Sequence, residues 1–215
     1  MNDTLIHKGL RKRLVDELKQ KGIDNRQVIS AIEKVPRHIF MDTGFAHLAY
    51  RDKPFPIGDG QTLSQPYTVA VQSSLLDISP RHRVLEVGTG SGYQAVILAE
   101  MGAVVFTIER YYSLFAKTRK LLQQMQYPIN IFHGDGFSGL PACSPFDRIL
   151  ITCAVGHIPE TLVNQLKPEG KMVIPIGDDS GQIMTLVKKK TDGSIECSEH
   201  GYYSFVPMLT GTVRY

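Results

Sequence analysis

The amino-acid sequence predicts an α/β protein: a doubly wound, mainly parallel sheet, with helices before it and antiparallel strands after it. Between residues 83 and 176, short apolar runs alternate with amphipathic runs. This alternation is typical of parallel strands covered by helices on both faces. Further on, two strand-like runs flank Asp192-Gly193 in "MTLVKKKTDGSIECSE". Asp-Gly between such runs is a hairpin signal, so we expect antiparallel strands there.

The N-terminal third is expected to consist of two helices and a loop. Within residues 4–21, leucine recurs at a helical interval with Lys and Arg between, which predicts a surface helix. The stretch "DNRQVISAIEKVP" predicts a second helix, with Asp24 as its N-cap and Pro36 ending it. Residues 42–67 are rich in proline and glycine and predict a loop.

The alternating region gives the order of the sheet elements. The run Lys188–Lys190 is expected on an exposed strand edge, where lysine discourages further pairing. The predicted strands are residues 83–87, 103–108, 129–133, 147–152 and 171–176, and the predicted helices between them are residues 93–102, 114–126 and 158–166.

Composition excludes several classes of protein. Hydrophobic residues make up 42% of the 215 residues and charged residues 21%, which argues against disorder. The net charge of +3 is too small to indicate a nucleic-acid partner. We expect no membrane span, no signal peptide and no metal site, because long apolar runs and metal-ligand spacings are missing from the sequence. Three cysteines without CxxC spacing fit the reducing cytoplasm, and a monomer is expected.

The strongest motif is the glycine-rich stretch in "VLEVGTGSGYQAV". Gly88, Gly90 and Gly92 fall where a predicted strand turns into a helix. Glycine there permits positive φ and lets a ligand approach the backbone closely. Glu109 ends the next strand about 20 residues on, the spacing at which a carboxylate accepts hydrogen bonds from ribose hydroxyls. The motif therefore predicts a nucleotide in the crevice at the carboxyl ends of the strands.

Two classes of nucleotide compete for this loop. The letters "GSGYQA" fit a dinucleotide pattern, but Glu86 lies on the preceding strand. A carboxylate would repel a pyrophosphate and would attract an ammonium and a sulfonium, which favours S-adenosylmethionine. In "GDG", residues 134–136, Asp135 can accept a hydrogen bond from the adenine amino group, and Gly136 leaves room for the ring. Taken alone, the stretch "GDG" is equally consistent with a simple turn that binds no ligand.

The series of glycine loop, Glu109 and "GDG" resembles class I S-adenosylmethionine-dependent methyltransferases, which are Rossmann-like. Over nearly the whole chain, the stretches "VPRHIF", "PIGDGQ", "QTLSQPY", "VLEVGTGSGYQAV", "IER", "GDG", "FDRILIT" and "FVPM" resemble the protein-L-isoaspartate O-methyltransferase family. The resemblance implies methylation of the free α-carboxylate of L-isoaspartyl residues in damaged peptides and proteins. It also implies a single methyltransferase domain, with N-terminal helices and substrate loop (1–78), cofactor-binding core (79–177) and C-terminal strands (178–215).

The resemblance assigns Ser64 as the active-site residue. An acceptor carboxylate is already ionised near pH 7, so displacement at the methyl group needs alignment rather than a base. Ser64 is therefore expected to donate a hydrogen bond to the substrate carboxylate and to aim one of its oxygens. Thr62, Gln65 and Val206 are expected to contact the substrate. The alternatives are a serine that caps a turn, hydrogen bonding within the loop, and ordinary packing of the valine.

Three other functions remain open on the sequence. A methyltransferase acting on nucleic-acid amino groups would usually place Asn/Asp-Pro-Pro-aromatic after the fourth strand, where this chain has "TCAVGHIP". A nicotinamide oxidoreductase would need a proton relay, for which no convincing set of residues is present. A cofactor-binding module without catalysis would bind the nucleotide but would not methylate any isoaspartyl peptide.

The chain also departs from the family pattern. Cys153 replaces a usual alanine, and Gln72 stands where an apolar residue is expected. We expect neither change to remove a ligand. Cys153 could narrow the site or add sensitivity to oxidation.

Overall fold

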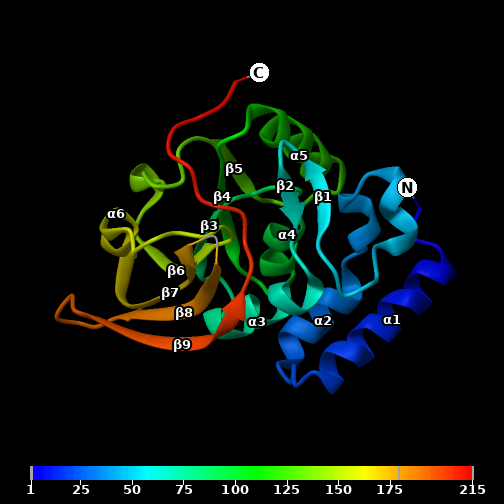
Figure 1. Ribbon diagram of the computed structural model, residues 1–215, viewed down its shortest axis with the longest axis horizontal. Coiled ribbons are helices and arrows are strands. Elements are labelled where there is room, and N and C mark those ends of the chain that lie inside the picture. The colour runs from blue at the N-terminus through cyan, green and yellow to red at the C-terminus, as the bar shows by residue number, and fades with distance from the viewer. Residues whose placement is uncertain (1, 179, 215) are drawn as a thin grey trace.

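A seven-stranded sheet lies at the centre of the computed structural model, which describes residues 2–178 and 180–214 (Figure 1). Its strand order is β5-β4-β3-β6-β7-β8-β9. A separate two-stranded sheet pairs β1 with β2. The strands are β1 (Phe55–Gly58), β2 (Gln61–Leu63), β3 (Arg83–Val87), β4 (Val104–Glu109), β5 (Asn130–His133), β6 (Phe146–Ile151), β7 (Leu166–Asp178), β8 (Gly181–Lys189) and β9 (Ile195–Tyr203).

Helices cover the sheet and form the N-terminal part of the fold. None in the described ranges combines the length and apolarity needed to cross a bilayer. The α-helices are α1 (Leu5–Gln20), α2 (Arg26–Lys34), α3 (Pro66–Leu76), α4 (Tyr93–Glu100), α5 (Tyr112–Gln124) and α6 (Glu160–Asn164), and the 3-10 helices are η1 (Arg37–Phe40), η2 (Thr43–Leu48) and η3 (Pro141–Cys143).

The predicted fold class is confirmed. β3 lies between β4 and β6 and runs parallel to both, while β5 and β7 extend the parallel part. β8 and β9 then add antiparallel strands at one edge. Because the chain leaves β3 first to one side and later to the other, the sheet has a topological switch point at the carboxyl end of β3, where α/β sheets bind ligands.

Apolar residues alternate between the two faces of the sheet. Val84 and Leu150 belong to the larger core cluster, which includes residues of α1 to α5. Their strand neighbours Leu85 and Ile149 belong to a second cluster, under α6 on the opposite face. This alternation follows from the two-residue period of a strand, and it explains why these strands read as continuous apolar runs.

Two local predictions are wrong. Asn25, not Asp24, caps α2, and its side chain accepts hydrogen bonds from the N–H groups of Gln27 and Val28. Residues 188–190 do not form a sheet edge, because β9 pairs with β8 along its length, with Lys188 opposite Glu196. The hairpin at Asp192-Gly193 thus places β9 along the edge of β8. Pairing with β9, not the lysines, prevents β8 from pairing with another strand.

The predicted loop at residues 42–67 contains regular structure. β1 and β2 form a hairpin whose turn residues, Asp59 and Gly60, have φ of +50° and +67°. Positive φ at both central residues is typical of a type I′ turn, for which Asp-Gly is a favoured pair. The signal was therefore present in "PIGDGQ". α3 follows directly, with Pro66 in its first turn, where proline is well tolerated.

The last parallel strand is longer than predicted and the helix before it is shorter. α6 begins only after Pro159, its N-cap residue. β7 begins at Leu166, which pairs with Phe146 on β6. The sequence "IPETLVNQL" has helical spacing throughout, but pairing to the buried edge of β6 overrides that local preference at its end.

Candidate functional site

A cavity opens at the carboxyl ends of β3, β4 and β6, at the switch point of the sheet. Its walls are the glycine loop (residues 88–92), the end of β4, the turn after β6, the connection between β2 and α3, and the C-terminal segment (residues 206–209). These pieces come from distant parts of the sequence. Their convergence at the predicted end of the sheet matches the expectation drawn from the glycine motif.

The glycine loop needs glycine for two separate reasons. Gly88 and Gly92 have φ of +96° and +84°, a region that other residues rarely adopt. A Cβ on Gly88 would lie 2.4 Å from Oγ1 of Thr152, and one on Gly92 would lie 2.7 Å from Cγ2 of Thr118. Gly88 and Gly90 line the cavity, whereas Gly92 is the N-cap residue of α4. The loop thus presents bare backbone to a ligand.

Glu109 ends β4 beside the glycine loop and lines the cavity. Its Oε2 accepts a hydrogen bond from the N–H of Gly90 at 2.8 Å, and its Oε1 accepts one from the N–H of Tyr111 at 3.0 Å. Burial raises the pKa of this carboxyl, and the backbone donors oppose the rise. Because each carboxylate oxygen can accept a second hydrogen bond, Glu109 retains capacity for the hydroxyl groups of a ligand.

Glu86 lies beneath the glycine loop rather than in the cavity wall. It is fully buried on β3, opposite Thr107 in the parallel register of β4. Its Oε2 accepts a hydrogen bond from the Thr107 hydroxyl, and its Oε1 has no partner among the described residues. Burial raises the pKa of Glu86 to about 8, the charge of Glu109 adds to the rise, and Thr107 opposes it. A direct contact of Glu86 with an ammonium group stays a prediction.

The "GDG" turn after β5 contributes one of its two predicted residues to the wall. Gly136 lines the cavity, and a Cβ there would lie 2.5 Å from Cγ1 of Val87. Asp135 is not in the wall, and its carboxylate accepts the N–H groups of Phe137 at 2.9 Å and Gly211 at 2.7 Å. Asp135 therefore anchors the chain that follows the C-terminal segment, and its predicted contact with adenine stays a prediction.

Ser64 lies on the connection between β2 and α3 and lines the cavity together with Thr62. Within the described part of the chain, its hydroxyl forms no hydrogen bond to a histidine or a carboxylate, so no paired general base is present. Gln65 lies outside this cavity, and its Nε2 donates to Oδ2 of Asp52 at 3.0 Å.

The C-terminal segment closes the cavity from the side of β6. The N–H of Ala154 donates to the carbonyl of Val206 at 2.8 Å, and the N–H of Met208 donates to the carbonyl of Ala154 at 2.7 Å. These two bonds attach the segment to the turn after β6 and place Val206 in the wall.

Sequence reasoning missed several residues of the wall. Some of them lie within or beside the motifs "IER", "VGTGSG" and "FVPM", so these motifs could have been used to predict them. Others come from turns with no signal of their own. The missed residues are Gln61, Leu63, Val69, Val87, Thr89, Ser91, Tyr93, Gln94, Ile108, Arg110, Tyr111, Thr152, Pro207, Met208 and Leu209.

Of the two departures from the family pattern, Cys153 lies in the cavity wall and Gln72 does not. Cys153 lines the cavity, and desolvation together with the charge of Glu109 raises the pKa of its thiol to about 12. A thiol that stays protonated is a poor nucleophile and resists oxidation. Gln72 is buried on α3, and its Nε2 donates to the carbonyl of Ile151 at 3.2 Å. It therefore ties α3 to the end of β6 and does not line the cavity.

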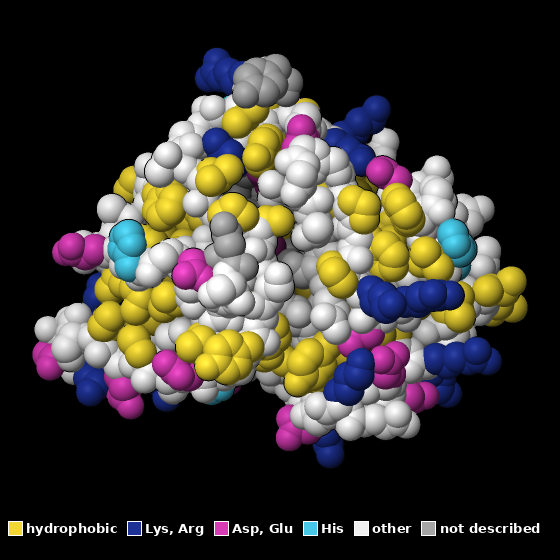
Figure 2. All heavy atoms as spheres, in the orientation of Figure 1, with side chains coloured by type: hydrophobic (Ala, Val, Ile, Leu, Met, Phe, Trp, Pro, Cys, Tyr) yellow, Lys and Arg dark blue, Asp and Glu magenta, His cyan; other side chains and the backbone are white. Residues whose placement is uncertain are grey.

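A second cavity of about 950 Å³ adjoins the first and shares Thr62, Ser64, Thr152 and Val206 with it. Its lining contains no Lys, Arg, Asp or Glu side chain within the described ranges. Figure 2 shows a hollow near the centre of this face, with hydrophobic and uncharged side chains around most of it. Aromatic side chains form much of the second wall: Tyr67, Tyr202, Tyr203 and Phe205.

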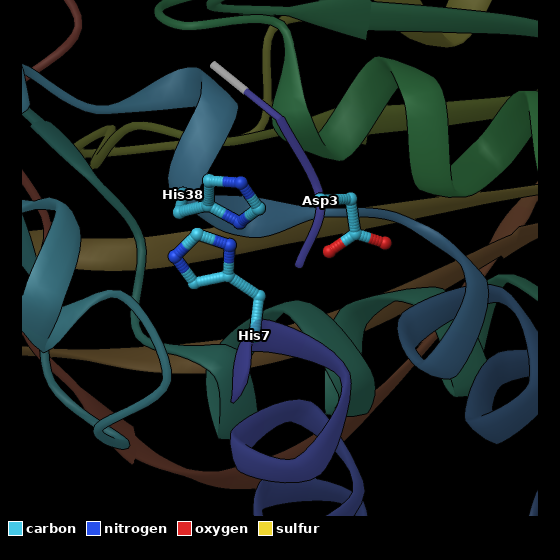
Figure 3. Close-up of side chains that lie close together, drawn as sticks. All are labelled: Asp3, His7 and His38. Carbon is cyan, nitrogen blue, oxygen red and sulfur yellow. The ribbon is translucent and has the colours of Figure 1, made fainter. Parts of the chain in front are cut away.

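A separate cluster of possible metal ligands lies near the N-terminus, where Asp3, His7 and His38 come together (Figure 3). The two imidazole rings stack at a centroid distance of 3.8 Å and an angle of 25°. Stacked rings direct their in-plane lone pairs side by side rather than toward one point. Both carboxylate oxygens of Asp3 also accept hydrogen bonds from the guanidinium of Arg11, at 2.9 and 3.1 Å. This arrangement fits a structural cluster better than a metal site.

Comparison with known proteins agrees with the geometry. The family model described as protein-L-isoaspartate(D-aspartate) O-methyltransferase matches residues 9–213. A protein-L-isoaspartate O-methyltransferase of Cytophaga hutchinsonii is 52% identical over 209 residues, covering 97% of this chain and 95% of that protein. One of Flavobacterium johnsoniae is 50% identical over 210 residues, covering 97% and 98%.

A solved structure shows the same fold. It is a putative protein-L-isoaspartate O-methyltransferase of Plasmodium falciparum in complex with S-adenosyl-L-homocysteine. The TM-score is 0.81 at 26% identity, and the alignment covers 93% of this chain and 98% of the other. The chain, with its switch-point cavity and its match over nearly its whole length, belongs to the protein-L-isoaspartate(D-aspartate) O-methyltransferase family.

Proposed function

We propose that the protein transfers a methyl group from S-adenosylmethionine to the free α-carboxylate of L-isoaspartyl residues in damaged peptides and proteins. The observation that carries the proposal is the place of Ser64. Ser64 lies where the glycine-lined cavity meets the second cavity, whose described lining carries no Lys, Arg, Asp or Glu, and no base is paired with it among the described residues. Transfer to an ionised carboxylate needs this arrangement of two adjoining sites and needs no base.

The residues of the first cavity fit the cofactor. S-adenosylmethionine supplies a methyl group on a positively charged sulfur. The backbone of Gly88 and Gly90 would lie against the cofactor, and Glu109 would accept hydrogen bonds from its ribose hydroxyls. The missing Cβ of Gly136 leaves room for the adenine ring, with Asp135 as the proposed acceptor of its amino group. Glu86, whose Oε1 is buried without a partner among the described residues, and Gly92 would support the loop from below.

Ser64 would orient the acceptor. Its hydroxyl donates a hydrogen bond to one oxygen of the substrate carboxylate and leaves the other oxygen free to face the methyl group. Thr62 and Val206, which line both cavities, would contact the substrate beside it, and Gln65 would line its path. Apolar side chains such as Leu63 and Val69 line the first cavity and keep water away from the reacting atoms.

The methyl ester explains how the reaction starts a repair. Esterification replaces an oxygen that leaves poorly with a methoxy group, so the neighbouring backbone nitrogen can attack the ester carbonyl, release methanol and close a succinimide ring. Hydrolysis of that ring yields partly normal aspartate. The enzyme must therefore accept many surrounding sequences. The second cavity supports this, because the described residues of its lining include no Lys, Arg, Asp or Glu that would select or reject flanking residues.

The setting of the enzyme is also part of the proposal. We propose that it acts as a monomeric single domain in the cytoplasm, without a nucleic-acid or membrane partner. The core cluster that continues from α1 to β8 supports one domain. The three free cysteines support a reducing compartment, and the net charge of +3 supports the lack of a polyanionic partner.

The test uses one peptide in two forms, with L-isoaspartate or L-aspartate at a single position. Each is incubated with the protein and methyl-labelled S-adenosylmethionine, and base-labile methyl ester is counted. We expect ester on the isoaspartyl form alone. No ester on either form, with cofactor binding intact, would reject the proposed acceptor and favour a binding module or another substrate.

Replacing Ser64 by alanine is expected to lower kcat about 30-fold and to raise the KM for the isoaspartyl peptide. The change removes one hydrogen bond to a charged oxygen, worth about 2 kcal/mol. Isothermal titration should show an S-adenosylmethionine affinity within about twofold of wild type, because Ser64 is not assigned to the cofactor. A normal kcat would show that the Ser64 hydroxyl does not act on the acceptor.

Replacing Glu109 by glutamine is expected to weaken S-adenosylmethionine binding about 10-fold, because a neutral amide accepts hydrogen bonds from ribose more weakly than a carboxylate. Titration calorimetry measures the change, and Glu33→Gln on the exposed surface of α2 serves as the control. An unchanged affinity would exclude Glu109 from the cofactor site.

A further inference from the structure

Asp52 is a buried carboxylate close to the Ser64 connection, with only 3% of its side chain exposed. Its Oδ1 accepts the backbone N–H of Tyr67 at 2.8 Å. Its Oδ2 accepts Nε2 of Gln65 at 3.0 Å and Nζ of Lys21 at 2.7 Å. Three donors from two distant parts of the chain therefore meet on one side chain.

Asp52 caps α3 from outside the helix. The N-cap residue, Gln65, forms no capping hydrogen bond with its side chain, so the first N–H groups of α3 need another acceptor. Asp52 supplies one to Tyr67, and its negative charge at the helix N-terminus is electrostatically favourable. The start of α3 is thereby fixed to the segment that precedes β1.

Ser64 immediately precedes the residues that Asp52 holds. Its own hydroxyl has no hydrogen-bond partner within the described ranges, so the backbone on either side determines where it points. On one side β2 pairs with β1, with Leu63 opposite Phe55. On the other side, Asp52 holds the side chain of Gln65 and the backbone of Tyr67.

Asp52 is itself placed by a buried arginine. Arg37 is fully buried, and it donates from Nε to the carbonyl of Ala49 at 2.9 Å and from Nη2 to the carbonyl of Lys53 at 3.3 Å. Its guanidinium also lies 5.0 Å from the ring centroid of Tyr93. Burial lowers the pKa of Arg37 to about 10, so it stays charged at neutral pH. The segment that carries Asp52 is therefore held at both ends.

We propose that Asp52 is the positioning residue that sets the direction of the Ser64 hydroxyl in the methyl-transfer site, through Gln65 and the first turn of α3. The inference rests on the proposed role of Ser64. Asp52 also orients the side-chain amide of Gln65, which lines the second cavity. Gln65 therefore links Asp52 to the Ser64 connection in addition to its proposed place along the substrate path. Lys21 joins α1 to the same carboxylate, but it does not touch the Ser64 connection directly.

The chain provides a matched control. Asp147 also accepts one backbone N–H, from Arg83 at 2.8 Å, and one lysine, Lys167, at 2.7 Å. It lies at the start of β6, at the end of the sheet away from the carboxyl-end cavity. Replacing either aspartate by asparagine removes a charge from a similar network, so a loss of general stability should be similar in both variants.

The experiment compares the wild type with Asp52→Asn, Asp147→Asn, Ser64→Ala and the double variant Asp52→Asn/Ser64→Ala, in the isoaspartyl-peptide assay at 25 °C. In Asp52→Asn, one oxygen becomes an amide nitrogen that cannot accept, so either Tyr67 or the pair Gln65 and Lys21 loses its acceptor, and the connection should shift. We expect kcat to fall about 10-fold, the size of loss that a small misplacement causes. S-adenosylmethionine affinity should stay within about twofold of wild type.

Two results distinguish positioning from plain stability. Asp147→Asn should keep kcat and KM within about twofold of wild type, although it unfolds at lower urea concentration. In the Ser64→Ala background, Asp52→Asn should cost less than about twofold, because a residue that acts through Ser64 has nothing left to position. The same 10-fold loss in both backgrounds, or an equal loss in Asp147→Asn, would overturn the inference. If the wild type makes no ester at all, the proposed function fails first, and this inference fails with it.

Discussion

Exchanging Glu86 for glutamine is expected to stabilise the cofactor-free protein at alkaline pH, by about 5 kcal/mol at pH 9. The pKa of Glu86 in the folded protein is about 8, against an ordinary value of 4.5. Between these two values the folded state holds a proton that the unfolded state releases. The contribution of the neutral acid to stability is therefore complete below pH 4.5 and is lost as the pH rises through 8. A glutamine keeps the acceptor for Thr107 and cannot ionise.

Urea unfolding between pH 5 and pH 9 measures this effect. The curve for Glu86→Gln should lie close to wild type at pH 5 and separate from it as the pH rises. Glu33→Gln, which removes a carboxylate from the exposed side of α2, should follow the wild type throughout. A gain of equal size at both ends of the pH range would mean that the effect comes from packing and not from ionisation.

Replacing Gly88 by alanine is expected to lower the free energy of unfolding by about 3 kcal/mol and to weaken S-adenosylmethionine binding at least about 10-fold. The residue has φ of +96°, and the added Cβ would lie 2.4 Å from Oγ1 of Thr152. That hydroxyl bonds to the carbonyls of Val87 and Gly88. It cannot move away without giving up these contacts, so the loop must move instead.

The control for this change is Gly156→Ala, since a Cβ at Gly156 meets no atom within 4 Å and its φ is not in the left-handed region. Urea unfolding and titration calorimetry should leave Gly156→Ala near wild type. A wild-type affinity in Gly88→Ala would show that the glycine loop is required for folding and not for the cofactor.

Features that depend on neighbouring residues could be predicted from the sequence. The glycine loop and Glu109 were predicted because strand, turn and helix signals follow one another within about 20 residues of sequence. The strands of the parallel sheet were predicted because both their faces are buried and their apolar runs are continuous. α3 was missed because its own residues are buried around most of its circumference, including the polar Gln72 and Ser73. Its sequence therefore lacks the polar stripe that marks a surface helix.

Features that depend on contacts between distant residues could not be predicted. Nothing in the sequence pairs Asp52 with Gln65, which are held together only because the β1–β2 hairpin folds back. The burial of Glu86 beneath the loop likewise depends on the register of β3 against β4. Asp135 shows the same limit, because its carboxylate holds the N–H of Gly211, 76 residues further on.

The wall formed by residues 206–209 affects when the protein can become active during its synthesis. Ribosomes build a chain from its N-terminus, so the glycine loop and Ser64 emerge long before Val206 and Met208. Until those two residues are made, the turn at Ala154 has no strand-like partner and the cavity lacks one side. A chain synthesised only as far as residue 205 would therefore have an incomplete cavity, and the wall would be completed only after residues 206–209 have left the exit tunnel.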